Sequence, residues 1–164
     1  MGSINTREVC LYSGTNTTSG VGFDINLIQA WQSAIVTLAI NTVSGTSPTL
    51  DVKVQNKLGQ ALFGTDSTAG FLTGTAIYDD FIAFTQTTTS STTRIIRCCN
   101  GPLTPTANAT VVTTADYATL DGALTAGTMR IGPIGGQWRV KFVVGGTSPS
   151  FAFSVVAQLI PFST

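Results

Sequence analysis

The sequence contains no histidine, and glutamate occurs once in 164 residues, as Glu8. The absence of histidine excludes Ser–His and Cys–His catalysis, histidine-ligated metals and histidine pH switches. Charged residues make up only 10% of the chain, and eight Lys and Arg balance eight Asp and Glu. Because so few cations are scattered along the chain, we expect no basic patch and no nucleic-acid partner.

Long apolar runs and a cysteine framework are also missing. No segment reaches 18 apolar residues and the first eight residues lack the pattern of a secretory signal, so we expect no membrane partner. The three cysteines are Cys10 and the adjacent pair Cys98 and Cys99. An odd number with one adjacent pair does not make a disulfide framework. We expect three small buried hydrophobic side chains in a protein made in a reducing cytoplasm.

Threonine and glycine are abundant, with 28 and 17 residues, and hydrophobic residues make up 43% of the chain. Threonine favours strands, whereas the scarce Glu and Lys dominate helix surfaces. Apolar and polar residues alternate in several stretches, which is the pattern of half-buried strands. These stretches are 21–27, 34–40, 50–55, 138–144 and 151–159, with shorter candidates at 94–99, 110–114 and 128–131. Residues 77–85 suit a helical turn or an irregular strand, and the Thr-rich residues 85–93 an exposed hairpin or loop.

Eight or nine short strands with turn signals between them predict an all-β protein, an antiparallel two-sheet β-sandwich that resembles a jelly roll. We expect residues 21–164 to form this single domain. Residues 1–20 are expected to form an extended N-terminal arm outside it. The arm carries Ile4, Val9, Leu11 and Tyr12 before a polar, turn-rich stretch, and it is expected to become ordered on binding a partner. A frayed terminus without a role is the alternative.

A short motif occurs twice. Residues 43–50 read VSGTSPTL, and residues 144–151, which lie 101 positions later, read VGGTSPSF. In each copy a glycine permits a positive φ and a proline fixes the backbone at the start of a strand. The motif is either one turn solution used twice or the sign of two similar halves lying side by side. In both interpretations we expect the tips of hairpins.

The repeat also carries a resemblance to a known family. Residues 43–55, the aromatic and acidic patch 78–81 and residues 138–151 resemble the head decoration (cement) proteins of tailed bacteriophages. The similarity extends over about residues 34–160 and describes hairpins, not an active site. The resemblance implies a β-sandwich that binds the major capsid protein on the outside of the shell. It also implies self-association, with a trimer favoured over a dimer, and a location on the capsid exterior of the virion.

Three possible chemical sites are weak. Asp79 and Asp80 form the one adjacent acidic pair, which suits a solvated turn or a helix N-terminus better than an acid/base or Ca²⁺ site. Residues 132–136 are rich in glycine but lack the lysine of a phosphate-binding loop. Trp31 and Trp138 could stack on a sugar, although core or interface packing fits the alternating strand of Trp138 better.

We therefore predict a non-catalytic virion structural protein that decorates and stabilises a phage capsid. No catalytic, cofactor-binding or metal-binding residue is predicted, and no cofactor. Two alternatives remain at this point. One is another phage component, such as a tail, head-completion or fibre module, and the other is a carbohydrate-binding jelly-roll module.

Overall fold

The structure of the chain is a computed structural model, and it describes residues 6–61, 75–90, 92–99, 110–112, 124–130 and 134–162. These residues form nine strands and no helix, so the described part contains no helix able to span a membrane. The strands are β1 (Arg7–Asn16), β2 (Gly20–Val21), β3 (Ile25–Asn26), β4 (Ser33–Ala61), β5 (Thr75–Ala83), β6 (Thr92–Cys99), β7 (Thr110–Val112), β8 (Thr128–Arg130) and β9 (Gln137–Ile160).

Hydrogen bonding joins all nine strands into one sheet. Its main path has the order β1-β9-β4-β5-β8-β7, while β2 and β3 pair with β9 and β6 pairs with β4. Every pairing is antiparallel except the short one between β7 and β8. The two longest strands, β4 and β9, therefore form the centre to which the others are added.

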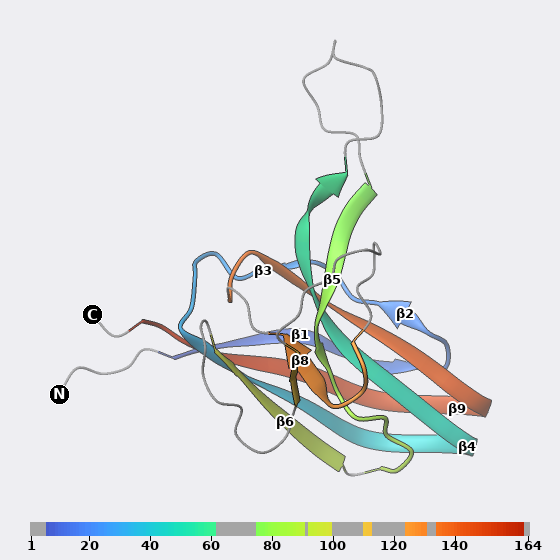
Figure 1. Cartoon of the computed structure of the whole chain (residues 1–164). Helices are drawn as coiled ribbons and strands as arrows, with labels where there is room; N and C mark the ends of the chain where they lie inside the picture. Colours follow the sequence, from blue (N-terminus) through green and yellow to red (C-terminus); the bar gives the residue numbers. More distant parts are fainter. Residues whose placement is uncertain are drawn as a thin grey trace.

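β4 and β9 pair along almost their whole length and bend together. The pairing runs from Ser33 opposite Ile160 to Asn56 opposite Trp138, with register shifts near the middle. Figure 1 shows both strands turning back at the same end of the molecule. Each strand is thereby divided into two halves. The first half of β4 and the second half of β9 lie with β1 and β6, and the remaining halves lie with β2, β3 and β5.

The two copies of the repeated motif form this bend, and they lie against each other. Gly45 and Gly146 have φ angles of 110° and 106°, in the region that favours glycine. A Cβ atom on Gly45 would lie 2.7 Å from the carbonyl oxygen of Ser148, and one on Gly146 would lie 2.7 Å from that of Ser47. The backbone of each motif thus packs directly against the glycine of the other, where a side chain would not fit. The two motifs therefore lie side by side at the bend, while the similarity of two whole halves stays a prediction.

The hairpin-tip prediction is wrong, because each motif lies within one strand and pairs with the other copy. The two strands are also not identical in length through the bend. β4 has one extra residue, Asn41, which lies at the register shift between Ile40 and Thr42. This β-bulge keeps the inward-facing positions in step on both sides of the bend.

One core lies between the two sets of halves. The alternating residues of both strands point into it, as the period-2 pattern predicts, together with residues from β1, β5 and β6. Its largest fully buried side chains include Trp138, Phe84, Phe151, Phe153 and Leu38. The rings of Tyr12, Phe142 and Phe153 pack with centroids 5.0–5.3 Å apart, which is the range of favourable aromatic contacts.

The prediction of an all-β, antiparallel fold is confirmed, with a strand, β5, over the stretch that could have been a helical turn. A two-sheet sandwich or jelly roll is not confirmed, because pairing is continuous through the bend. The arm prediction differs from the structure. Residues 7–16 form β1, which pairs with β9, and Leu11 is buried in the core. β1 is hydrogen-bonded along its length to β9, and its inward-facing side chains pack against the core. This segment is therefore an edge strand of the sheet and not a separate arm.

Candidate functional site

The segment Gly20–Trp31, which we call the edge segment, runs along the free side of the first half of β9. Its two short strands pair there, with Gly20 opposite Phe142 and Ile25 opposite Trp138. Two further main-chain hydrogen bonds, from Leu27 N to Gly136 O at 2.9 Å and from Trp31 N to Ile134 O at 2.7 Å, continue the attachment. The edge segment is therefore fixed to the sheet at several points along its length.

Buried and exposed apolar residues alternate irregularly in the edge segment. Leu27 and Trp31 are buried, and the Trp31 indole N–H donates to the Leu27 carbonyl at 3.2 Å. In contrast, Phe23 is 90% exposed, Ile28 is 72% exposed and more than half of Val21 is exposed. Exposure on this scale is unusual for a phenylalanine, since burial of such a side chain stabilises a fold by about 1.5–3 kcal/mol.

The sequence pattern predicts Val21 and Phe23 on the inward face of a strand, and this prediction is wrong. The ladder to β9 stops after Val21 and resumes at Ile25. Gly22 N still donates to Val140 O at 2.7 Å. Because the backbone leaves the ladder between the two short strands, strict alternation no longer decides which side chains face inward.

Ile28 has a φ angle of 71°, a conformation that β-branched residues rarely adopt. The Asn26 side-chain oxygen accepts a hydrogen bond from Ile28 N at 2.8 Å, and Gln29 N donates to Leu27 O at 2.8 Å. The second bond closes a γ-turn with a positive central φ, which is the rare and strained form. Such a conformation costs about 1–2 kcal/mol and holds a large apolar side chain in solvent.

A polar anchor lies next to Phe23. The Asp24 carboxylate accepts hydrogen bonds from the Tyr78 hydroxyl at 2.8 and 2.9 Å and from the Lys57 ammonium at 3.0 Å. Burial opposes ionisation of Asp24, but these two hydrogen bonds and the charges of Lys57 and Arg139 outweigh it and lower the pKa of Asp24. Burial and the bond to Asp24 raise the pKa of Tyr78. Asp24 is therefore held as a carboxylate by a protonated tyrosine.

The anchor continues into β4 and β9. The Arg139 guanidinium lies 3.2 Å from the centre of the Tyr78 ring, a stacked cation–π contact. Arg139 also donates to the Gln55 side-chain oxygen at 2.8 Å, and Gln55 donates to Asp80 at 2.8 Å. Because a connected network of this kind rigidifies the groups that it joins, the base of the edge segment is pre-organised.

Asp79 and Asp80 do not occupy a solvated turn or a helix N-terminus, because both are buried in β5. Asp80 accepts hydrogen bonds from Lys53, from Gln55 and from Leu124 N at 3.1 Å. Asp79 pairs with Arg130 at 3.2 Å, and burial raises its pKa against the opposing effect of Arg130. Each carboxylate thus has its own cation, and they do not form a shared acid/base pair.

The two tryptophans do not form an exposed sugar-stacking site. Trp138 is buried in the core as predicted, and Trp31 is buried too, so neither ring is free to stack on a sugar.

Cys10 is exposed and not in a disulfide, contrary to the prediction of a buried thiol, because it lies on the outward side of β1. The side chains of Cys98 and Cys99 and residues 131–133 lie outside the described part of the chain. Within that part, no three Cys, Asp or Glu residues gather into a metal-binding group.

Comparisons with known protein families, with curated proteins and with solved structures find no match for this chain. The edge segment is an exposed apolar segment on a rigid base, in which Phe23 and Ile28 project beside the buried Leu27 and Trp31 and the hydrogen-bonded carboxylate of Asp24. Large apolar side chains presented on a pre-organised base are typical of protein-binding surfaces.

Proposed function

We propose that this chain is a non-catalytic virion structural protein that binds the outer surface of a tailed-phage capsid and stabilises it. The partner is the major capsid protein, and the protein is a head decoration (cement) protein, as the resemblance of residues 43–55, 78–81 and 138–151 implies. In this proposal the single sheet, which folds over at the bend of β4 and β9, plays the structural role that the two-sheet sandwich has in that family. Self-association also belongs to this proposal: the resemblance favours a trimer over a dimer, whereas the charge distribution on one face of the sheet favours a two-fold dimer of the free protein.

The exposure of Phe23 and Ile28 is the observation that carries the proposal. Both side chains are far more exposed than a folded monomer favours, and Ile28 is held there at a cost in backbone strain. A partner surface that covers them recovers the hydrophobic stabilisation that the free protein lacks. The ordering cost of binding is small, because main-chain bonds and the Asp24 anchor already fix the segment.

The scarcity of charge suits a protein present in many copies on one shell. The formal net charge is zero, so neighbouring copies repel one another little. Threonine and serine hydroxyls supply hydrogen-bonding groups without the desolvation cost of full charges. A dense layer of such proteins can therefore form without electrostatic repulsion between its members.

Copy number in purified phage particles tests this proposal. Heads and tails are separated, and the chain is quantified in each fraction by mass spectrometry with an isotope-labelled standard. A decoration protein is expected in the head fraction at a copy number comparable to that of the major capsid protein. A few copies per particle, or recovery with tails, would instead identify a completion, tail or fibre component and overturn the proposal.

A further inference from the structure

The outer side of the sheet half formed by β1, β9, β4 and β6 is an open face with almost no charge. Each of its rows crosses the four strands in register. One row is Cys10, Val156, Thr37 and Ile95, and the next is Ser13, Ser154, Ala39 and Thr93. We call this surface the uncharged face. Its side chains are small, apolar or hydroxylic, and none of these eight is buried.

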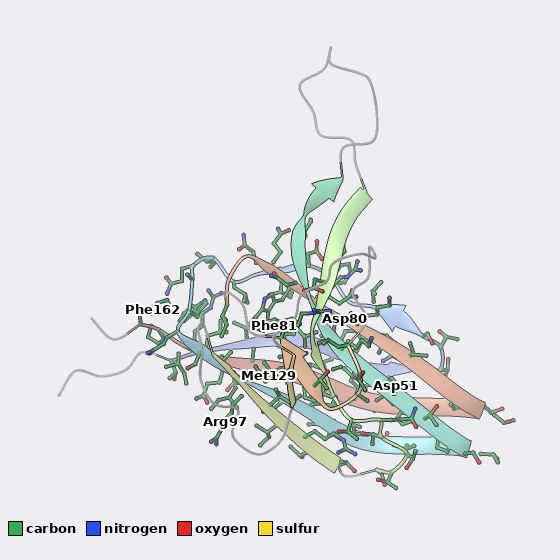
Figure 2. The ribbon with its side chains drawn as sticks, in the orientation of Figure 1. Asp51, Asp80, Phe81, Arg97, Met129 and Phe162 are labelled. Carbon is green, nitrogen blue, oxygen red and sulfur yellow. The ribbon has the colours of Figure 1, made fainter. Side chains whose placement is uncertain are left out.

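Among the described residues of the uncharged face, charged side chains occur in one row only. That row is Glu8, Gln158, Ile35 and Arg97, so the two charged residues lie at opposite edges, on β1 and β6. Figure 2 labels Arg97. Both side chains are exposed, and neither has an ion-pair partner among the described residues. Three strand spacings, about 14 Å, separate them, so they cannot pair within one molecule.

From this arrangement we infer that a second copy of the chain covers the uncharged face, related by a two-fold axis parallel to the strands. Such an axis exchanges the edges and keeps each row in place, so that β1 of one copy lies over β6 of the other. Glu8 of each copy then lies over Arg97 of the other, and two complementary ion pairs form at the rim. An isologous interface must be self-complementary, and opposite charges at the two ends of one row meet that condition under this axis.

The dimensions of the face suit a reversible dimer. Four strands about 4.8 Å apart, and seven residues of about 3.4 Å from Gln158 to Ala152, give a surface of about 19 by 24 Å. Two such faces bury about 900 Å² in total, which is less than stable specific interfaces bury and corresponds to a weak, transient contact. Two sheets packed about 10 Å apart also leave a centre of apolar and hydroxyl groups, with charges at the rim, as interfaces do.

The test measures the mass of the free full-length protein by sedimentation velocity over a range of concentrations. Wild-type protein is expected to pass from monomer to dimer. Glu8→Arg and Arg97→Glu should each raise the dissociation constant of the dimer about tenfold or more. In either variant, both contacts between residue 8 of one copy and residue 97 of the other bring like charges together. The double variant Glu8→Arg/Arg97→Glu should return the constant to near the wild-type value, because both contacts are restored with reversed sign.

Thr37→Lys provides an independent test at the centre of the face, and Val143→Lys is its matched control. Val143 is a half-exposed strand residue of the other sheet half. Thr37→Lys should abolish the dimer and Val143→Lys should leave it unchanged, with the β-sheet circular dichroism retained in both. A monomer at all concentrations, a trimer, a failure of the double variant to recover, or a dimer of Thr37→Lys would each overturn the inference. Because no capsid is present, the result is independent of the proposed capsid binding.

Discussion

Ile28 illustrates how a single residue carries both strain and exposure. Its φ of 71° suits glycine and is unfavourable for a β-branched side chain. The side chain gains little from the fold, since 72% of it is exposed. A residue that costs the free protein stability and is nevertheless held outward by the Asn26 side chain is best explained by a contact made on binding.

Ile28→Gly is therefore expected to stabilise the free protein by about 0.5–1 kcal/mol, because the relief of strain exceeds the extra entropy of the unfolded chain. The same change should weaken capsid binding. Urea unfolding measures the first effect and co-sedimentation with capsids the second. A variant that is less stable than wild type would show that Ile28 is not strained in the way described.

Asp24 gives a pH dependence with a definite sign. Its folded-state pKa is lowered below 3.8, mainly by the Tyr78 and Lys57 hydrogen bonds, which act against burial. A lowered pKa means that the stabilisation is present above the unfolded-state pKa and is lost as the pH falls through the folded-state pKa. The Asp24 contribution should therefore be complete at neutral pH and absent in strong acid.

Asp24→Asn is expected to lower the free energy of unfolding by about 1 kcal/mol at pH 7. The difference from wild type should shrink as the pH falls through the lowered folded-state pKa of Asp24, because the carboxyl group then becomes neutral like the amide. Asp51→Asn is the matched control, since the Asp51 carboxylate accepts hydrogen bonds from the exposed Gln86 amide. An Asp24→Asn difference that stays constant with pH would contradict the charged anchor.

At the scale of elements, the bend of β4 and β9 depends on two glycines that face each other's chain. A Cβ atom added at either glycine would lie 2.9 Å from a proline Cα atom in the other motif, and close to a carbonyl oxygen as well. These neighbours are backbone atoms and cannot move without disturbing the pairing. The two copies of the motif are therefore one structural unit, although they lie far apart in the sequence.

Gly45→Ala and Gly146→Ala are each expected to destabilise the protein by about 3 kcal/mol, from the positive φ and from the overlap. Gly136→Ala separates the two causes. Its φ is also positive, at 74°, but the nearest atom to an added Cβ is a side-chain oxygen of Asn56 at 3.8 Å. Gly136→Ala should cost about 1 kcal/mol. Equal losses for all three variants in urea unfolding would argue against the interlocked bend.

The elements that sequence reasoning predicts best are those whose alternation is complete. In residues 34–40, 50–55 and 151–159, every second side chain faces the same core. The period of two in the sequence therefore predicts both the strand and its buried face. The joining of these stretches into two continuous strands is not predictable in this way. It depends on the contact between two motifs 101 residues apart, and either motif read alone resembles a hairpin turn.

The edge segment shows why the candidate site is harder to predict than the strands. Its apolar residues alternate like those of a strand, but the ladder is interrupted at Phe23 and Asp24. Gly20, Gly22 and the charged Asp24 around Phe23 are the one signal in the sequence that the strand is irregular. The partner of Asp24, Tyr78, lies 54 residues away, and no local pattern connects them.

At the scale of the whole molecule, the two proposed binding surfaces are separate. The edge segment borders the first half of β9, and the uncharged face lies on the other sheet half, with the second half of β9 (Figure 1). One protein can therefore contact a capsid and a second copy at the same time. Because the two-fold contact closes on one partner, a copy bound through the edge segment presents its uncharged face to a single further copy.

The central claim is that Phe23 and its segment bind the capsid, and co-sedimentation of the purified protein with capsids stripped of it tests this most directly. Phe23→Ser is compared with Phe162→Ser, which removes a half-exposed phenylalanine close to the C-terminal end of β9 (Figure 2). We predict saturable binding of wild type and of Phe162→Ser, and a loss of affinity of at least about tenfold for folded Phe23→Ser. Binding of Phe23→Ser as tight as that of wild type, or no binding of wild type to the capsids, would contradict the account.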